Sequence, residues 1–454
     1  MSANGRTAEH SEPLRVVVAG GGIAGAEVLL ALGDLAGDRI SLTLVSPGAE
    51  LVLPALSVAE PFGLGRAQRF SLTDLLARVD GDLVVGSLAA VDRQERQIRL
   101  ADGATLGFDA LVIATGARAV ARVEHATTWW PRGDPETFGG LLRDIEEGYT
   151  RRVAFVIPPG AVWPLPLYEL ALMTAREISG MGIDGAELTV ITPEAVPLAL
   201  FGSAAARAVR EELARLGIRL EVATLARVRP AAPLEVVLQP TIRRLSVDRV
   251  VALPGVDGPR IPGTTQNHAG FILVGPGGLM RGSKSIWAAG DAIAYPVKLG
   301  ALASQQADAV AGEIAARVGV QTPARPAGLK LRGVLMTGAA PRAVGSGTSS
   351  AETEHRPIWR PEDKVHGAYL TPYLHNLSPT IVPGGNPAEG VIVDETLPGT
   401  DAEEAGSFHA LWRGEQGSPD YLHRLGHQMH AYEAAHNQSG DLLRGHGQLP
   451  GRMR

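Results

Sequence analysis

The chain of 454 residues contains no cysteine. Without a thiol, disulfides, thiolate metal sites, cysteine nucleophiles and dithiol relays are all excluded, so redox chemistry requires a bound cofactor. Aromatic residues make up only 5% of the chain, and no uncharged apolar run approaches the roughly 18 residues of a membrane-spanning helix. The N-terminal stretch has no apolar signal region either. We therefore expect a cytoplasmic protein with no integral membrane segment.

Basic clusters are also missing. The net charge is −6 and the pI is about 6.1, so the surface that neutralises phosphates is absent and we expect no nucleic-acid partner. Hydrophobic residues make up 45% of the chain and charged residues 20%, which is typical of a globular protein. The length is about three times that of a typical domain, which predicts two or three domains.

A strand, a glycine-rich turn and a helix follow one another near the N-terminus. A β-branched run at 15–19 leads into the sequence GGGIAG at 20–25 and then into a helical pattern. In a dinucleotide-binding turn, Gly20 permits the tight turn, Gly22 lets amides approach a pyrophosphate, and Gly25 allows close packing of helix and strand. A glycine-rich turn without a ligand is the alternative.

The second strand of this unit ends without the usual acidic residue. In dinucleotide-binding folds that residue binds the ribose hydroxyls, and here the position holds Ser46. Serine still donates one hydrogen bond, so we include Ser46 in the site. Glu50 lies nearby and is left out as a solvated side chain.

Two further turns carry the same kind of signal. Ala114-Thr115-Gly116 and Ala289-Gly290-Asp291 each follow a buried strand, at the edge where α/β folds bind ligands. Together with 20–25 they resemble the three FAD signatures of the flavin-dependent pyridine nucleotide-disulfide oxidoreductase superfamily. The resemblance implies that Asp291 binds the ribityl chain or phosphate of FAD, and that Thr115 and Gly116 close the pocket near the adenosine half.

Within that superfamily the chain resembles the group of sulfide:quinone oxidoreductases, flavocytochrome c sulfide dehydrogenases and type II NADH dehydrogenases. The similarity rests on the run 296–300 and on Leu53-Pro54 with Val58-Ala59. It implies extended FAD, with the helix that starts near Ala301 directed at the flavin pyrimidine ring. Lys298 beside that helix terminus would stabilise the negative charge of reduced flavin; the alternative is an ordinary surface lysine.

The sequence departs from this group in two ways. The sulfide enzymes use a pair of redox cysteines, which this chain lacks, so sulfide is not expected as the donor. The turn expected to bind a second nucleotide, at 157–167, contains four prolines and Trp163. Proline has no N–H to offer a pyrophosphate, so the second site is degenerate, and NAD(P)H stays open as the direct donor.

Glu169 is the second predicted catalytic residue beside Lys298. The run Tyr168-Glu169-Leu170-Ala171 resembles a segment of type II dehydrogenases in which the glutamate lies near the flavin. A carboxyl group in a partly apolar pocket has a raised pKa suited to proton transfer. A glutamate favoured by the helix dipole is the alternative. The predicted cofactor-binding residues are Gly20, Gly22, Ile23, Ala24, Gly25, Ser46, Pro54, Ala114, Thr115, Gly116, Gly290, Asp291, Lys298 and Ala301.

The predicted fold is α/β, with two Rossmann-like (three-layer) domains and a small α+β C-terminal module. The FAD-binding domain is expected to be discontinuous, over 14–120 and 246–320, with an inserted second domain over 121–245. The C-terminal module is placed at 321–384, and 385–454 is read as a tail that is partly disordered or forms a short helix.

Two residue clusters near the C-terminus allow more than one interpretation. Trp359, Tyr369 and Tyr373 would suit a planar acceptor such as a quinone, and core packing or contact within a homodimer explains them equally well. His423, His427 and His430 share one face of a predicted helix. No further ligand accompanies them, so we expect a solvated face and no metal site.

These observations predict an FAD-dependent oxidoreductase. Two electrons would pass through FAD from a small donor, with NAD(P)H as one option, to a quinone or another acceptor. The alternative is a non-catalytic FAD-binding scaffold or sensor derived from the same family.

Overall fold

A computed structural model describes residues 12–131, 133–161, 163–322, 329–333, 335–338, 365, 367–377 and 393–397. These residues lie in one compact unit, Met1–Ala405. The predicted α/β fold class is confirmed, because two parallel five-stranded sheets carry helices between their strands.

The first sheet has the strand order β20-β9-β1-β2-β5, and all of its pairs are parallel. Its strands are β1 (Leu14–Ala19), β2 (Ile40–Ser46), β5 (Asp82–Val85), β9 (Ala110–Ile113) and β20 (Ile286–Ala288). The central strands are runs of Val, Leu, Ile and Ala that are buried on both faces, as expected when both faces are covered.

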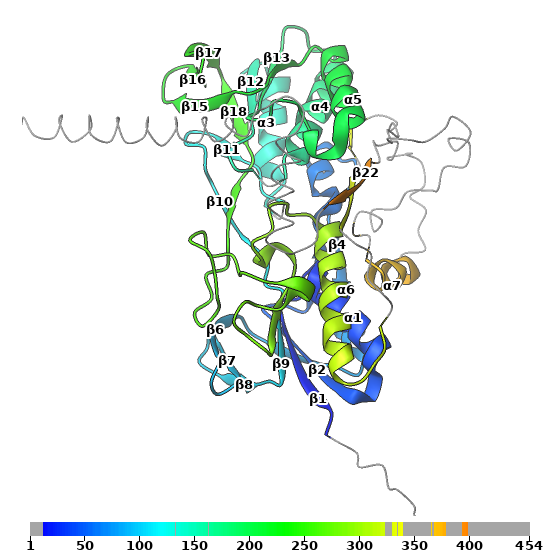
Figure 1. The fold of residues 1–454 in the computed structure, drawn as a ribbon. Coiled ribbons are helices and arrows are strands. Elements are labelled where there is room, and N and C mark those ends of the chain that lie inside the picture. The colour runs from blue at the N-terminus through cyan, green and yellow to red at the C-terminus, as the bar shows by residue number, and fades with distance from the viewer. Residues whose placement is uncertain are drawn as a thin grey trace, which may run out of the picture. The chain divides into compact units, whose positions relative to one another are not determined.

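Helices cover one face of this sheet and a meander covers the other (Figure 1). The helices are α1 (Ile23–Ala36), α2 (Leu72–Arg78) and α6 (Gly300–Arg317), and α1 packs directly on α6. The antiparallel meander is β6 (Leu88–Asp92), β7 (Gln97–Leu100) and β8 (Thr105–Gly107). The main hydrophobic core lies between the sheet and α1, α2 and α6.

The second sheet has the order β11-β18-β12-β13-β14 and is also parallel. Its strands are β11 (Thr127–Thr128), β12 (Arg152–Val156), β13 (Glu187–Ile191), β14 (Arg219–Glu221) and β18 (Arg249–Ala252). Its helices are α3 (Glu136–Glu146), α4 (Leu165–Gly180) and α5 (Gly202–Arg215). A three-stranded antiparallel sheet follows, formed by β15 (Leu225–Arg229), β16 (Leu234–Gln239) and β17 (Arg243–Val247).

The boundary predicted between residues 245 and 246 does not follow the sheets. It cuts through β17, and it assigns β18 to the first domain although β18 pairs with β12 and β11 of the second sheet. The chain returns to the first domain after Ala252, where β19 (Gly255–Asp257) pairs with β10 (Arg118–Val120) as an antiparallel connection. The apolar strand VVA of β18 gives no local sign of which sheet it joins.

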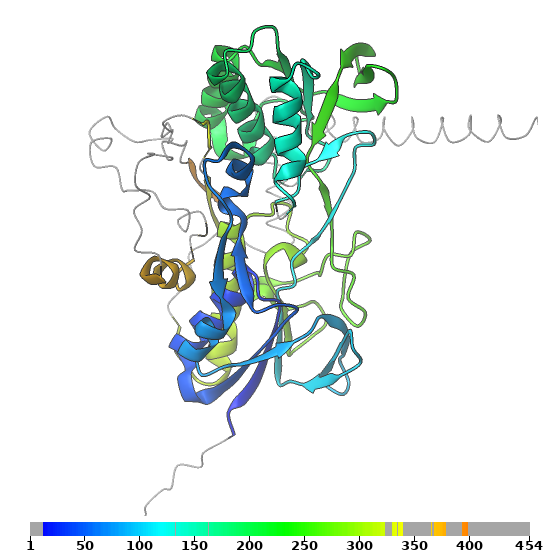
Figure 2. The same cartoon turned by 180° about the vertical axis from the view of Figure 1, so that it is seen from behind.

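β3 (Glu50–Leu53) and β4 (Gln68–Ser71) form a hairpin. It extends from the first sheet toward the helices that accompany the second sheet (Figure 2). The 3₁₀ segment η2 (Pro54–Phe62) within it contacts α3 and α4. Phe62 packs against Phe138 of α3 with ring centroids 5.6 Å apart. The other 3₁₀ segments are η1 (Gly37–Arg39), η3 (Ala199–Phe201), η4 (Pro276–Gly278) and η5 (Gly290–Ala292).

Near the C-terminus, β21 (Leu329–Gly333) pairs with β22 (Val393–Leu397), and α7 (Leu370–Leu377) packs on α1. The pairing joins the predicted C-terminal module to a strand inside the predicted tail, so the boundary at 384 separates two partners. Tyr373 belongs to the core beside α1, and Tyr369 packs against that core, which favours the core-packing interpretation. Trp359, His423, His427 and His430 lie outside the described residues.

Candidate cofactor cavity

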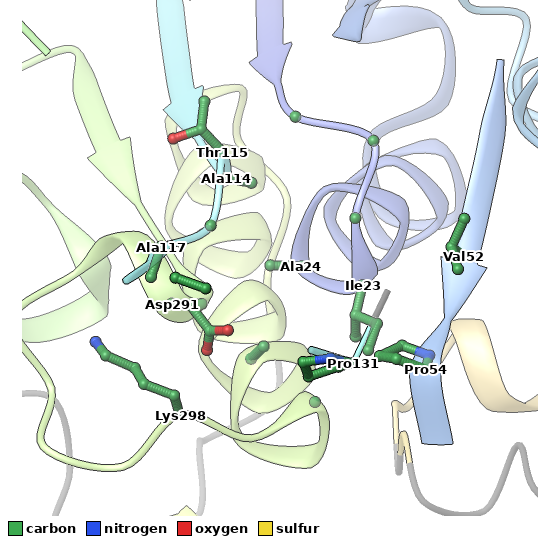
Figure 3. A pocket seen from close by; sticks show the side chains of 18 of the residues that line it. Ile23, Ala24, Val52, Pro54, Ala114, Thr115, Ala117, Pro131, Asp291 and Lys298 are labelled. Atoms are coloured by element: carbon green, nitrogen blue, oxygen red, sulfur yellow. The ribbon is translucent and has the colours of Figure 1, made fainter. Parts of the chain in front are cut away.

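A cavity of about 1230 Å³ opens at the carboxyl edge of the first sheet. The turns after β1, β9 and β20 all contribute to it, because parallel strands place their carboxyl ends at one edge. Thirteen of the predicted site residues line it: Gly20, Gly22, Ile23, Ala24, Ser46, Pro54, Ala114, Thr115, Gly116, Glu169, Gly290, Asp291 and Lys298. Figure 3 shows Asp291 and Lys298 on one side of this space and Val52 and Pro54 on the other.

The three glycines of the first turn have different surroundings. Gly20 has a φ of +119°, and a Cβ there would lie 2.3 Å from the carbonyl oxygen of Ala114. A Cβ on Gly25 would lie 1.9 Å from the carbonyl oxygen of Gly20. A Cβ on Gly22 would meet no atom within 4 Å. Gly20 and Gly25 are therefore required by the fold, whereas Gly22 leaves space in front of the turn.

Two predicted binding residues do not line the cavity. Gly25 lies behind the turn, where its lack of a side chain lets α1 approach the backbone of Gly20. Ala301 is completely buried in the first turn of α6, and the neighbouring Gly300 and Ala303 line the cavity instead. Gly25 therefore has the packing role that its place in the turn predicted, whereas Ala301 packs inside the first turn of α6 and does not line the cavity, because its direction depends on the exact start of that helix.

Asp291 is placed by a turn with an unusual backbone conformation. Gly290 has a φ of +71°, and its N–H donates to Oε1 of Gln306 on α6 at 2.9 Å. This hydrogen bond ties the end of β20 to α6. It fixes Asp291 at the cavity wall between the strand and the helix.

Lys298 is buried, not a surface lysine. Its Nζ donates to the carbonyl oxygen of Ile293 at 2.5 Å and lies 4.3 Å from the ring centroid of Phe271. Burial lowers the pKa of Lys298 to about 8, and the charge of Asp291 opposes this shift. The side chain therefore brings a titratable cation to the cavity wall.

Glu169 is contributed by α4, a helix of the second sheet. It lies in the first turns of α4, is buried, and lines the same cavity as Asp291 and Lys298. Its Oε1 accepts a hydrogen bond from the backbone N–H of Met336 at 2.8 Å. The carboxyl group is therefore held at the junction of the two domains and the segment 335–338.

Sequence reasoning missed part of the wall. Glu50, which we left out of the site, lines the cavity; its side chain is exposed, as predicted, and forms an ion pair with Arg69 at 2.9 Å. Three tryptophans, Trp129, Trp130 and Trp163, also line it, although aromatic residues are few in this chain. Trp129 and Trp130 follow β11, and Trp163, which we named only as an obstacle to a second nucleotide, precedes α4; none of the three is part of a periodic pattern that would have identified it as cavity wall.

A second carboxyl group, Glu194, is buried beyond the end of β13. Its Oε2 accepts hydrogen bonds from the Tyr168 hydroxyl at 2.6 Å and the Thr192 hydroxyl at 3.0 Å, and Leu198 N–H donates to its Oε1 at 3.0 Å. Burial raises the pKa of Glu194 from 4.5 to about 7, although these hydrogen bonds oppose the shift.

The raised pKa of Glu194 predicts a pH-dependent stability. The folded state binds the proton more tightly, so this contribution is fully present below pH 4.5 and is lost as pH rises through about 7. The shift corresponds to roughly 3 kcal/mol in the free energy of unfolding. Glu194→Gln should make the free energy of unfolding less dependent on pH between these values. Glu211→Gln, on the exposed side of α5, should not. Parallel profiles for wild type and Glu194→Gln in urea unfolding would refute the assignment.

In the part of the chain that the structure describes, no helix is both long and apolar enough to cross a membrane.

Two parallel Rossmann-like sheets with a cavity at the carboxyl edge of the first form a fold that this chain shares with solved structures of a sulfide:quinone oxidoreductase, a persulfide reductase and an NDH2. The resemblance predicted from the three turns is confirmed for the fold. The chain resembles the sulfide:quinone oxidoreductase of Aquifex aeolicus with a TM-score of 0.65 and 21% identity, covering 72% of this chain and 82% of that one.

Other solved structures show the same fold. The ferredoxin reductase for the CYP199A2 system of Rhodopseudomonas palustris has a TM-score of 0.53 and 20% identity, covering 74% of this chain and 86% of that one. The NAD-dependent persulfide reductase of A. fulgidus has a TM-score of 0.52 and 19% identity, covering 70% of this chain and 62% of that one.

A curated relative is similar over a shorter stretch. The probable ferredoxin reductase CtmF of Castellaniella defragrans is 40% identical over 111 residues, which span 23% of this chain and 26% of that protein. No protein-family model matches the chain.

Proposed function

We propose that this protein is an FAD-dependent oxidoreductase. The observation that carries the proposal is the convergence of three separate turns, at Gly22, Thr115 and Asp291, on one cavity. Each follows a strand of the same parallel sheet, where α/β folds bind their ligands.

The residues present fit the cofactor. Gly22 leaves open space at the N-terminus of α1, where backbone amides and the helix dipole favour a pyrophosphate. Ser46 ends β2 at the position that contacts a ribose, and Asp291 offers a carboxylate to hydroxyl groups. Lys298 and the N-terminus of α6 bring positive charge to the same wall.

FAD, when bound, supplies two-electron transfer between a donor and an acceptor. The chain's own residues position the cofactor and control charge and protons around it. Lys298 provides a cation, and Glu169 a carboxyl group that can hold a proton at the cavity wall. A small-molecule donor, a quinone or soluble carrier as acceptor, a cytoplasmic location and a homodimer belong to this proposal.

The first test is the flavin content of the purified protein. We expect one FAD per chain, measured by visible absorption and by release on denaturation. Anaerobic dithionite should bleach the bound flavin, and a panel of quinones should restore its absorption. Protein that is folded and free of flavin, and that does not take up added FAD, would contradict the proposal. Bound flavin that no acceptor reoxidises would support the non-catalytic scaffold instead.

Lys298 is expected to raise the reduction potential of the flavin. Lys298→Met should lower the midpoint potential at pH 7 by at least about 30 mV, which is about 1.4 kcal/mol for two electrons. The difference from wild type should shrink as pH rises through about 8, because Lys298 then loses its charge. Lys298→Arg, which keeps a charge, serves as the control. Equal potentials in wild type and Lys298→Met across this range would exclude the role.

A further inference from the structure

The second domain repeats the strand–turn–helix–strand plan of the first. Two backbone hydrogen bonds show which residues of the two domains correspond. In the first domain the N–H of Gly20 donates to the carbonyl of Val45 at 2.8 Å, and in the second the N–H of Ile157 donates to Ile191 at 2.9 Å. Ile157 is therefore equivalent to Gly20, and Thr192 to Ser46. A dinucleotide in the second domain would lie in the crevice between the segments that start at Ile157 and Thr192.

The segment on the pyrophosphate side of this crevice has lost amide donors to proline and to hydrogen bonds within the protein. Its turn runs from 157 to 164, whereas the turn of the first domain runs from 20 to 22. The turn contains Pro158, Pro159 and Pro164, and Pro166 follows in the first turn of α4; none of the four has an N–H. The N–H groups of Ala161 and Leu167 donate to Pro158 and Pro164 at 3.2 and 3.1 Å. The helix N-terminus therefore offers little to a phosphate.

The segment on the ribose side is already hydrogen-bonded within the protein. The hydroxyl of Thr192 donates to Oε2 of Glu194 and accepts from the N–H of Glu194 at 3.1 Å. Oε2 of Glu194 also accepts from Tyr168, and Oε1 accepts from Leu198. A ribose that used the Thr192 hydroxyl as a donor, or Oε2 of Glu194 as an acceptor, would have to displace these buried hydrogen bonds, which is costly.

Two side-chain pairs span the crevice. Tyr168 projects from the first turn of α4 and reaches Glu194 beyond β13. Trp163, in the turn before α4, meets Phe201 beyond β13 edge-on, with ring centroids 5.2 Å apart and an interplanar angle of 61°. Both pairs connect the two segments between which a dinucleotide would lie.

We propose that these two pairs close the second domain to dinucleotides, so that neither NADH nor NADPH binds there to reduce the flavin. This inference rests on the proposed function. Glu194, Tyr168 and Trp163 then determine donor specificity. Because Trp163, Leu165 and Pro166 also line the flavin cavity, the domain that would hold a nucleotide forms a wall of the flavin site instead.

The test uses the full chain with its flavin. Flavin content and bleaching by dithionite are measured first, so that failure of the proposed function is seen before any nucleotide is added. NADH and NADPH are then titrated under nitrogen up to about 1 mM, the upper end of ordinary KM values. ADP-ribose, which carries the adenosine and pyrophosphate groups, is tested by equilibrium dialysis.

We expect no saturable reduction of the flavin by either nucleotide and no binding of ADP-ribose, although dithionite bleaches the flavin fully. Saturable reduction by NADH or NADPH would overturn the proposal. Saturable binding of ADP-ribose would also overturn it, if Trp163→Ala or Glu194→Gln changed the dissociation constant at least threefold. If ADP-ribose binds and neither substitution alters its dissociation constant, the nucleotide binds outside the crevice. That result would support the proposal that the crevice is closed.

Discussion

Replacing Gly22 with valine is expected to empty the cavity of flavin while leaving the fold intact. A Cβ at this position meets no protein atom within 4 Å, so the fold has room for a β-carbon there. The valine would occupy the space in front of the turn, where the pyrophosphate must approach the amides. We expect the affinity for FAD to fall at least about 100-fold, or about 2.8 kcal/mol.

The measurement is FAD titration of apoprotein followed by flavin fluorescence, with circular dichroism as the check on folding. Gly180→Val is the matched control, because a Cβ at Gly180 at the end of α4 also meets no atom within 4 Å and this residue does not line the cavity. Equal affinity of Gly22→Val and Gly180→Val for FAD would show that the pyrophosphate does not lie at this turn.

A second large effect is expected at Glu27, which holds the segment around α7 against the first domain. Glu27 lies on α1 and is completely buried. Its Oε1 and Oε2 accept hydrogen bonds from the N–H groups of Tyr369 and Leu370, both at 2.8 Å. On α6, the Ser304 hydroxyl donates to the carbonyl of Val365 at 2.7 Å. The segment is thus hydrogen-bonded to α1 and α6, the two helices whose N-termini line the cavity.

In Glu27→Ala we expect α7 to open locally more often than in the wild type. The change removes the acceptor of the buried Leu370 N–H, at a cost of about 1–3 kcal/mol, and that of the part-buried Tyr369 N–H, at a smaller cost. The apolar contacts of α7 remain, so the expected result is local opening, not global unfolding. Amide hydrogen exchange in α7 should accelerate at least about 30-fold, the equivalent of roughly 2 kcal/mol.

Hydrogen exchange resolved by mass spectrometry measures this effect, with α4 as an internal reference. Glu211→Ala on the exposed side of α5 is the control, and it should leave α7 protected. Unchanged protection of α7 in Glu27→Ala would mean that its apolar contacts, and not the carboxylate, hold it in place.

The fold class and the central part of the site could be predicted from local patterns. Runs such as ALVI in β9 are typical of strands buried on both faces, and a glycine turn after such a strand is set by neighbouring residues. Because parallel strands share one carboxyl edge, the turns at Gly22, Thr115 and Asp291 could be placed together without coordinates. The resemblance to a flavoprotein family depends on these same short segments.

The sequence by itself determined the two α/β units, the absence of thiol chemistry and the three turns, because each depends on residues close together in the chain. Only the tertiary structure decided that β18 joins the second sheet, that Lys298 is buried and that Glu27 fastens α7. It also decided that Glu194 faces Tyr168 and not an open crevice. Burial and hydrogen bonding of a charged side chain depend on segments far away in sequence, and no local pattern records which segments those are.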